Sequence, residues 1–165
     1  MNRQSFDTYV EMITEGGAHE AQQAGSETIE AEHLLLSIAA DRESTMGQLL
    51  SAAGLDYRTA QEALQREFRQ SLHSAGVSLD DHDLPRPRAS ATPPSRMGQS
   101  AKLAFERGLA AVHGRKDARP EHLLLGILQL KFGAVPRALA LAGVDQATLR
   151  SRVEQSLQRP VTPNE

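Results

Sequence analysis

The chain has 165 residues, a formal net charge of −3 and no cysteine. That length is enough for one domain or for two small, closely packed halves. The lack of cysteine excludes disulfide bonds and thiolate metal sites, and the slightly acidic balance disfavours a nucleic-acid partner, which usually requires a basic face. The longest apolar run, 138–144, is much shorter than the ~18 residues of a membrane-spanning helix, and residues 1–5 do not read as a signal peptide. We therefore expect a cytoplasmic protein with no nucleic-acid and no membrane partner.

The first predicted helix begins near Phe6 and ends near residue 24. Phe6, Val10 and Ile13 recur at the spacing of one helix face. Glycines at positions 16 and 17 interrupt this pattern, and each costs about 1 kcal/mol relative to alanine in a helix interior. This helix should therefore depend on packing against the rest of the chain.

The second predicted helix opens with Glu32-His33-Leu34-Leu35-Leu36. The same five residues recur as Glu121-His122-Leu123-Leu124-Leu125, which is 89 positions later (122 − 33 = 89). The register extends beyond the pentapeptide, since Gly54 matches Gly143 and Asp56 matches Asp145. A self-match at a fixed long period is the signature of a duplicated structural unit. The leucines should form the core of each half.

Both pentapeptide glutamates fall in the first turn of their helices. The helix dipole favours a carboxylate there by ~0.3–1 kcal/mol, so Glu32 and Glu121 have a plain stabilising role as an alternative to any binding role. His33 and His122 are better interpreted as partly buried hydrogen-bonding residues than as ligands. A zinc motif of the H-E-x-x-H type is not present, and we expect no metal site and no cofactor.

A short third helix and a longer fourth helix complete each copy. The fourth helices follow Asp56 and Asp145, which are good N-cap residues. Their apolar stripes are predicted to be core and consist of Leu64, Phe68 and Leu72 in one copy and Leu149, Val153 and Leu157 in the other. No stretch alternates as a strand would. The sequence therefore predicts an all-α fold of two four-helix repeats.

The segment between the copies differs in composition. It contains four prolines between positions 85 and 94, and such a density of proline cannot continue a helix. Its acidic run, 80–83, is better explained as a solvated loop than as a cation site, because a flexible segment must first be ordered. The predicted organisation is a first repeat at 1–73, a flexible linker at 74–94, a second repeat at 95–157 and a disordered tail at 158–165, with both repeats in one globular domain.

A duplicated four-helix unit whose second helix opens with Glu-His-Leu-Leu-Leu resembles the Clp amino-terminal (Clp repeat) domain, particularly that of the ClpC type. The resemblance covers residues 6 to about 157. It implies two pseudo-twofold-related repeats that receive substrates, adaptor proteins or cyclic peptides for an AAA+ motor, without catalysis by the domain itself. The chain has no G-x-x-x-x-G-K-[ST] phosphate loop, so we expect a free-standing module without the motor.

In the ClpC type, each pentapeptide glutamate is associated with the guanidinium of a phosphorylated arginine, and a hydroxyl residue 25 positions earlier helps to hold the phosphate. Here those earlier positions (32 − 25 and 121 − 25) are Asp7 and Arg96. If each lies beside its own glutamate, the first half should prefer plain arginine and the second an arginine that bears an anion. The residues that the resemblance assigns to arginine or peptide binding, with their neighbours, are Glu32, Glu121, Phe6, Asp7, Thr8, Ser95 and Arg96.

The resulting hypothesis is a non-catalytic protein- and peptide-binding module. It would act as an accessory, adaptor or decoy in Clp-dependent proteolysis, or sequester peptide ligands. The implied partners are a ClpC-type AAA+ unfoldase or its adaptors and substrates, with phosphoarginine-containing or cyclic peptides as possible ligands. The alternative is a structural or regulatory protein that acts by self-association or through an unrelated partner. An enzyme is disfavoured, because no nucleotide loop, metal motif or nucleophile elbow is present.

Overall fold

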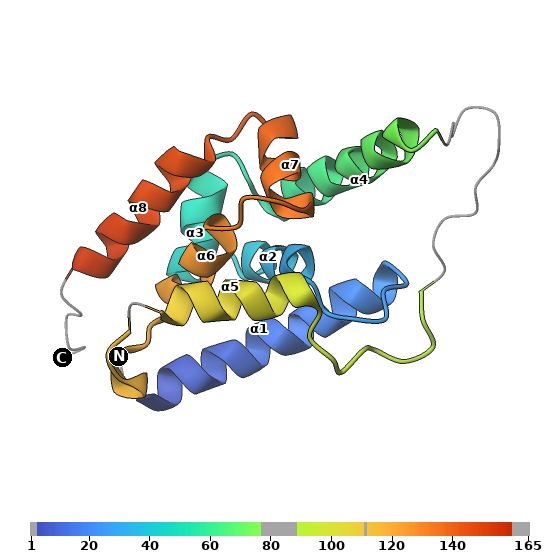
Figure 1. Ribbon diagram of the computed structural model, residues 1–165. Coiled ribbons are helices and arrows are strands. Elements are labelled where there is room, and N and C mark those ends of the chain that lie inside the picture. Colours follow the sequence, from blue (N-terminus) through green and yellow to red (C-terminus); the bar gives the residue numbers. More distant parts are fainter. Residues whose placement is uncertain (1–2, 77–88, 111, 160–165) are drawn as a thin grey trace.

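The computed structural model describes residues 3–76, 89–110 and 112–159. Within these ranges the chain forms eight α-helices and one 3₁₀ helix, and no β-strand (Figure 1). The predicted all-α fold is therefore confirmed. The helices of the first half are α1 (Arg3–Gln23), α2 (Ala31–Ala40), α3 (Thr45–Ala52) and α4 (Tyr57–Ser74), and those of the second half are α5 (Gln99–Leu109), the 3₁₀ helix η1 (Arg115–Asp117), α6 (Pro120–Leu128), α7 (Ala134–Leu141) and α8 (Gln146–Gln158).

The two halves repeat one order of helices in register. The starting residues of α2, α3 and α4 precede those of α6, α7 and α8 by the same interval (120 − 31, 134 − 45 and 146 − 57, each 89). The leading helices differ more, because α1 has 21 residues and α5 has 11. The duplication seen in the sequence is thus a duplication of structure.

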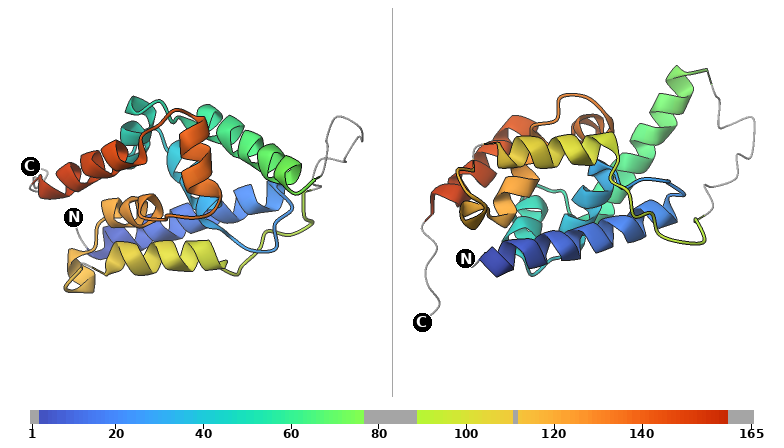
Figure 2. Two further views of the ribbon diagram at one scale, coloured as in Figure 1. Left: turned by 45° about the horizontal axis from the view of Figure 1, so that its top comes forward. Right: turned by 60° about the horizontal axis from the view of Figure 1, so that its bottom comes forward.

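The two pentapeptide helices lie in the middle of the fold. α1 packs on α2 and α5 packs on α6, while α3 and α4 also pack on α2 and α8 also packs on α6 (Figures 1 and 2). Leu35 and Leu124 are 1% and 0% exposed, which places both at the centre of one continuous core. Burial of these apolar side chains is the main driving force for the fold.

Glycine allows the central helices to approach their neighbours closely. α1 continues unbroken through Gly16, where an added Cβ would overlap the Oγ of Ser37 on α2. In the second half, a Cβ at Gly126 would overlap the carbonyl oxygen of Ala104 on α5. The glycines expected to weaken the first helix are therefore contact points, and packing compensates for their low helix propensity.

The halves are joined by a short parallel bridge as well as by helix packing. The N–H of Ile29 donates to the carbonyl oxygen of Arg96 at 2.9 Å, and the N–H of Gly98 donates to that of Ile29 at 2.8 Å. α4 also packs on α7, and α3 on α8. Helices and backbone segments of each half thus pack directly against those of the other half.

The segments predicted to be irregular are described only in part. Residues 77–88 of the predicted linker and 160–165 of the predicted tail lie outside the described residues. In the described part of the linker, Ser90 exchanges two hydrogen bonds of 3.0 Å with the backbone and side chain of Gln22 on α1. Residues next to the second repeat therefore pack on the first helix.

The stripe predicted for the fourth helix is only partly buried. Leu64 packs against the core, but Phe68 is 52% exposed, so its assignment to the core was wrong. The reason is that the buried residues of α4 are Ala60, Ala63 and Glu67, so that Phe68, one residue after Glu67, lies off the buried face. No helix in the described part of the chain is long and apolar enough to cross a bilayer.

Candidate functional site

Each pentapeptide histidine caps the helix that it begins. The backbone N–H of Glu30 donates to Nδ1 of His33 at 2.9 Å, and that of Arg119 donates to Nδ1 of His122 at 2.9 Å. This is the contact that a glutamate makes from the third helical position in a capping box, with imidazole as the acceptor. Burial lowers the pKa of both histidines, which favours the neutral ring that the cap requires. The caps fix the first turns in which the pentapeptide glutamates lie.

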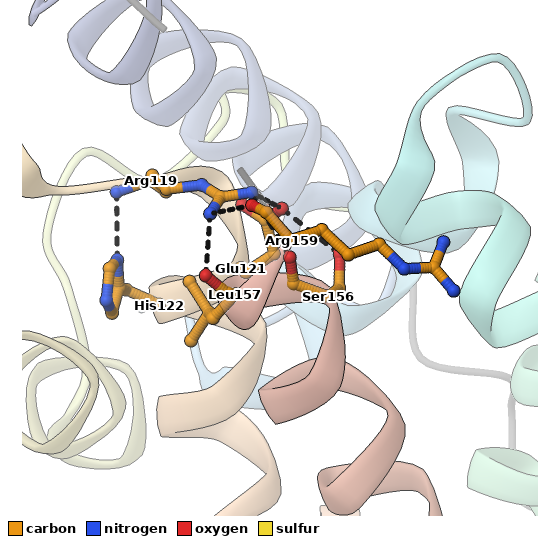
Figure 3. Close-up of polar contacts among 6 residues, drawn as sticks. All are labelled: Arg119, Glu121, His122, Ser156, Leu157 and Arg159. Atoms are coloured by element: carbon orange, nitrogen blue, oxygen red, sulfur yellow. Dashed lines mark hydrogen bonds and ion pairs between the residues drawn. The ribbon is translucent and has the colours of Figure 1, made fainter. Parts of the chain in front are cut away.

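Glu121 is buried and already bound to a guanidinium. Its side chain is 7% exposed, and its Oε1 lies 2.7 Å from Nη2 of Arg119, two residues earlier. The hydroxyl of Ser156 on α8 donates to the same oxygen at 3.3 Å. Figure 3 shows the guanidinium between Glu121 and the end of α8. The second pentapeptide glutamate is therefore occupied by the chain's own arginine.

Arg119 also binds the carboxyl end of α8. Its Nη1 donates to the carbonyl oxygen of Leu157 at 2.9 Å and to that of Arg159 at 3.5 Å, and its Nη2 donates to that of Ser156 at 3.4 Å (Figure 3). The last carbonyl groups of a helix have no partner within the helix and carry partial negative charge. A guanidinium satisfies both features at once. One atom is left over, because Nε of Arg119 is buried without a hydrogen-bond partner.

Glu32, the counterpart of Glu121, is partly exposed, and within the described residues no other side chain hydrogen-bonds or ion-pairs with it. Burial raises the pKa of Glu32, and a hydrogen bond from its own backbone N–H opposes this shift. The charges of Glu30 and Glu67 raise the pKa further, whereas the charge of Arg137 lowers it. The first pentapeptide glutamate therefore lies near two other carboxylates, and its charged form is disfavoured there.

The neighbours of Glu32 have partners of their own. Glu67 on α4 is 6% exposed and accepts from Nε of Arg137 on α7 at 2.8 Å and from the hydroxyl of Ser71 at 2.6 Å. Glu30 accepts from the hydroxyl of Thr28 at 2.8 Å and from the N–H of Ser100 at 3.2 Å. This pairing leaves Glu32 as the carboxylate that can accept a further cation.

The repeat register explains why the two glutamates differ. Position 30 corresponds to position 119 (30 + 89), so the first half has Glu30 where the second has Arg119. Position 67 corresponds to position 156 (67 + 89), so Glu67 replaces Ser156. The first half thus has carboxylates in place of the arginine and the serine that contact Glu121.

The structure pairs the remaining predicted site residues differently from the sequence-based hypothesis. Gly17 of α1 lies against Leu34 at the start of α2, and Asp7 is ten residues earlier (17 − 7), which corresponds to ~15 Å of helix. Asp7 lines a pocket with Ala118, next to Arg119. The expectation that Asp7 lies beside Glu32 is therefore wrong, because α1 and α2 run antiparallel.

The expectation that Arg96 lies beside Glu121 is wrong for a related reason. The backbone of Arg96 pairs with Ile29, which precedes α2, and Arg96 is not among the charges that act on Glu32. Ser95 and Arg96 are exposed there. Thr8 is exposed on α1 and Phe6 is buried beside Asp7. The predicted set is thus divided between two places, and neither joins a glutamate to the residue 25 positions before it.

A pocket of ≈ 630 Å³ lies between the start of α1, the end of α5 and the segment before α6. Its lining is mainly apolar, with two carboxylates, and comprises Phe6, Asp7, Val10, Glu11, Phe105, Leu109, Val112, Gly114 and Ala118. Such a surface fits an apolar side chain with a cationic neighbour. It extends to within one residue of Arg119.

Comparison with known proteins identifies the family. The family model for the Clp repeat (R) N-terminal domain matches residues 6–89 and 95–164, so the chain belongs to this family. It is 32% identical over 141 residues to the chaperone protein ClpD2, chloroplastic, of Oryza sativa subsp. japonica, covering 85% of this chain and 13% of that protein. It is 29% identical over 138 residues to the negative regulator of genetic competence ClpC/MecB of Bacillus subtilis (strain 168), covering 84% of this chain and 15% of that protein.

The fold matches a solved structure of the same class. The N-terminal domain of the chaperone ClpD from Arabidopsis thaliana superposes with a TM-score of 0.65 at 20% identity, covering 96% of this chain and 98% of that one. The predicted resemblance to the Clp amino-terminal domain is confirmed. The chain spans only a small part of the length of the two curated relatives.

The sequence-based hypothesis missed five residues that build these sites: Glu30, Glu67, Arg119, Arg137 and Ser156. The 89-residue register contained a signal for two of the differences, namely Glu30 against Arg119 and Glu67 against Ser156. These residues reach the pentapeptide glutamates only because the last helix of each repeat folds back to the start of the second helix. The sequence alone does not show this folding back.

Proposed function

We propose that this chain is a non-catalytic module that binds arginine-bearing segments of other proteins. The observation that carries the proposal is the contrast between the two pentapeptide glutamates. Glu121 holds a guanidinium at 2.7 Å, and Glu32, at the same position of the other repeat, has no such partner among the described residues. An incoming arginine side chain would make at Glu32 the contact that Arg119 makes at Glu121.

The charge around Glu32 selects the form of arginine. Glu30 and Glu67 act on Glu32 with the same sign as its own charge, and Arg137 is the opposing charge. This environment attracts a guanidinium and repels a phosphate. We therefore expect unmodified arginine to bind more tightly than phosphoarginine. The sequence predicted the same preference for the first half, but from Asp7 and not from Glu30 and Glu67.

The neighbouring carboxylates suit an extended cation better than a metal ion. In the part of the chain that the structure describes, no group of three or more histidines and carboxylates is placed to hold a metal. A guanidinium has five N–H donors in one plane, so it can bind carboxylates that do not converge on a point. Arginine in a protein segment is thus the ligand that this arrangement supports.

The relatives suggest where such a module acts. Both curated relatives are Clp proteins, one described as a chaperone and the other as a negative regulator of competence. We propose a role as accessory, adaptor or decoy in Clp-dependent proteolysis, with a ClpC-type unfoldase, its adaptors or its substrates as partners. The apolar pocket beside Phe6 is a further place for a peptide or a cyclic peptide.

Titration with a short peptide that carries one arginine tests the proposal. We expect saturable binding to the wild type that is at least tenfold weaker in Glu32→Gln, because a charge-assisted hydrogen bond contributes about 1.5–3 kcal/mol. Glu43→Gln is the matched control, since it removes an exposed charge from beyond the other end of α2. Equal affinity of wild type and Glu32→Gln would contradict the proposal.

Self-association remains a second candidate function because of one observation. Phe132, in the turn between α6 and α7, is 89% exposed, and Phe68 is 52% exposed. Large exposed aromatic side chains are common at protein interfaces. Sedimentation velocity over a range of concentrations tests this candidate: a dimer that Phe132→Ser abolishes would support it, and a monomer throughout would exclude it.

A further inference from the structure

Phe132 is exposed in a turn that does not require an aromatic side chain. It lies between α6 and α7 and is 89% exposed. Position 132 corresponds to position 43 (132 − 89), where the first repeat has the exposed Glu43 in the corresponding turn. Because one repeat forms this turn with a carboxylate, the fold does not account for a phenyl ring in the other. Exposed aromatic side chains of this kind are enriched at protein interfaces.

The apolar pocket between α1 and α5 is also absent from the corresponding place of the other repeat. Leu109 and Val112 line the pocket from the second repeat, whereas the first repeat has Glu20 and Gln23 at the matching positions (each 89 earlier). Leu109 is 36% exposed, so the pocket leaves apolar surface in contact with solvent. The duplication therefore does not reproduce this apolar surface a second time.

Phe132 and the pocket are complementary in size, polarity and charge. The pocket has a volume of ≈ 630 Å³ and a mainly apolar lining, which suits a phenyl ring. Lys131, next to Phe132, is exposed, and the charged residues of the lining are the carboxylates Asp7 and Glu11. A phenyl ring in the pocket would therefore bring an ammonium group towards carboxylates, and such charge complementarity favours a specific partner.

One copy of the chain does not place Phe132 in its own pocket. The pocket extends to Ala118, before the start of α6, whereas Phe132 follows the end of α6. The nine residues of α6 separate the two places by about 13 Å along the helix axis. A contact between the ring and the pocket must therefore join two molecules.

We propose that two copies of the chain associate by insertion of Phe132 of one copy into the apolar pocket of the other, with Lys131 beside Glu11. This inference rests on self-association, the second candidate function given above, and identifies the two surfaces that make the contact. Arginine binding at Glu32 is independent of it. The contact joins two different patches, so each copy offers both a ring and a pocket. An interface centred on one aromatic side chain is small, and the association should be weak and depend on concentration.

Two substitutions that import residues of the first repeat test the contact. Phe132→Glu removes the ring and Leu109→Glu places a charge in the pocket, and each introduces the residue that the first repeat has at that position. In sedimentation velocity over a range of concentrations, either change should weaken the association by about tenfold or more, as expected for loss of an aromatic anchor or its receptor.

Matched controls separate this effect from a general loss of apolar surface. Leu103→Glu makes the same change on α5 at a residue that is also 36% exposed, and Phe68→Glu makes it at another exposed phenylalanine. Both controls should associate as the wild type does. If Leu109→Glu does not fold, Glu11→Lys replaces it: this charge reversal should weaken the association, and addition of Lys131→Glu in the same chain should restore it.

A mixture of the two variants distinguishes this contact from other modes of self-association. Phe132→Glu keeps the pocket and Leu109→Glu keeps the ring, so the mixture should form a complex with one copy of each, although neither variant associates alone. Wild-type association of Leu109→Glu, or a mixture that stays monomeric, would overturn the inference. If Phe132→Glu alone abolished association, the second candidate function would still stand, with another surface as the receptor. A wild type that is monomeric throughout would exclude both.

Discussion

Glu30 and Ser100, 70 residues apart in the chain, cap each other's helices across the two repeats. The N–H of Ser100, near the start of α5, donates to Oε2 of Glu30 at 3.2 Å. In return, Oγ of Ser100 accepts from the N–H of Ala31, the first residue of α2, at 2.8 Å. Burial alone would raise the pKa of Glu30, but the hydrogen bonds from Ser100 and Thr28 lower it. This contact holds the N-terminus of α2, where Glu32 lies, against the N-terminus of α5 in the other repeat.

Replacing Ser100 by alanine should weaken this junction. The variant removes the acceptor for the N–H of Ala31 and the hydroxyl donor to Glu30, so we expect a loss of about 1 kcal/mol in the free energy of unfolding. The pKa of Glu30 should rise, since the donors that lower it are reduced in number. Urea denaturation and NMR titration of the carboxyl groups measure the two effects. Ser51→Ala, on the exposed surface of α3, is the control, and an unchanged stability of Ser100→Ala would show that the reciprocal cap is not significant.

Stability should fall in mildly acidic solution because of the two histidine caps. The pKa of His33 and of His122 is lowered in the folded state from an ordinary value of 6.5. The neutral rings therefore contribute stability that is complete above about 6.5 and is lost as the pH falls from there through the folded-state values. Protonation of Nδ1 would also remove the acceptor for the N–H of Glu30 or Arg119.

Glutamine at both positions tests this account, because its side chain can accept the same hydrogen bond without titrating in this range. The double variant His33→Gln/His122→Gln should lose most of the change in unfolding free energy between pH 7 and pH 5. His73→Gln, at the exposed end of α4, should retain it. An identical pH dependence in the double variant would refute the role of the caps.

The duplicated core predicts similar costs for equivalent substitutions. Leu35 and Leu124 are 1% and 0% exposed at corresponding positions of α2 and α6, so alanine at either should lower the free energy of unfolding by ~2–5 kcal/mol. Leu103, which is 36% exposed on α5, serves as the control and should cost much less. If only one of the two core variants were destabilised, the halves would not share a core in the way described.

The fold could be predicted from the sequence because the same pattern of helices occurs in both copies of the repeat. The leucines of the two pentapeptides, the matched glycines and the N-cap aspartates give the order and the register of the helices without knowledge of their packing. Phe68 was the exception, since its helical spacing is that of a core residue, whereas the buried face of α4 passes through Glu67 instead.

The sites could be predicted only in part, because their contacts cross between distant segments. The sequence identifies Glu32 and Glu121 as special, but whether each is free depends on Arg119 and on helices that return to the same place. The pairing of Asp7 with Glu32 failed because antiparallel helices place the start of α1 far from the start of α2. Sequence distance was a poor guide to spatial distance at that point.

The most direct test of the account is to locate a bound arginine by NMR. A peptide with a single arginine is titrated into the uniformly labelled protein, and the backbone amide shifts of α2 and α6 are followed. We predict saturable shifts at Ala31, Glu32 and His33 that Glu32→Gln abolishes, with the corresponding residues of α6 unaffected while Arg119 occupies Glu121. Equal shifts at the starts of both helices, or shifts that persist in Glu32→Gln, would contradict the claim that the first repeat is the open arginine site.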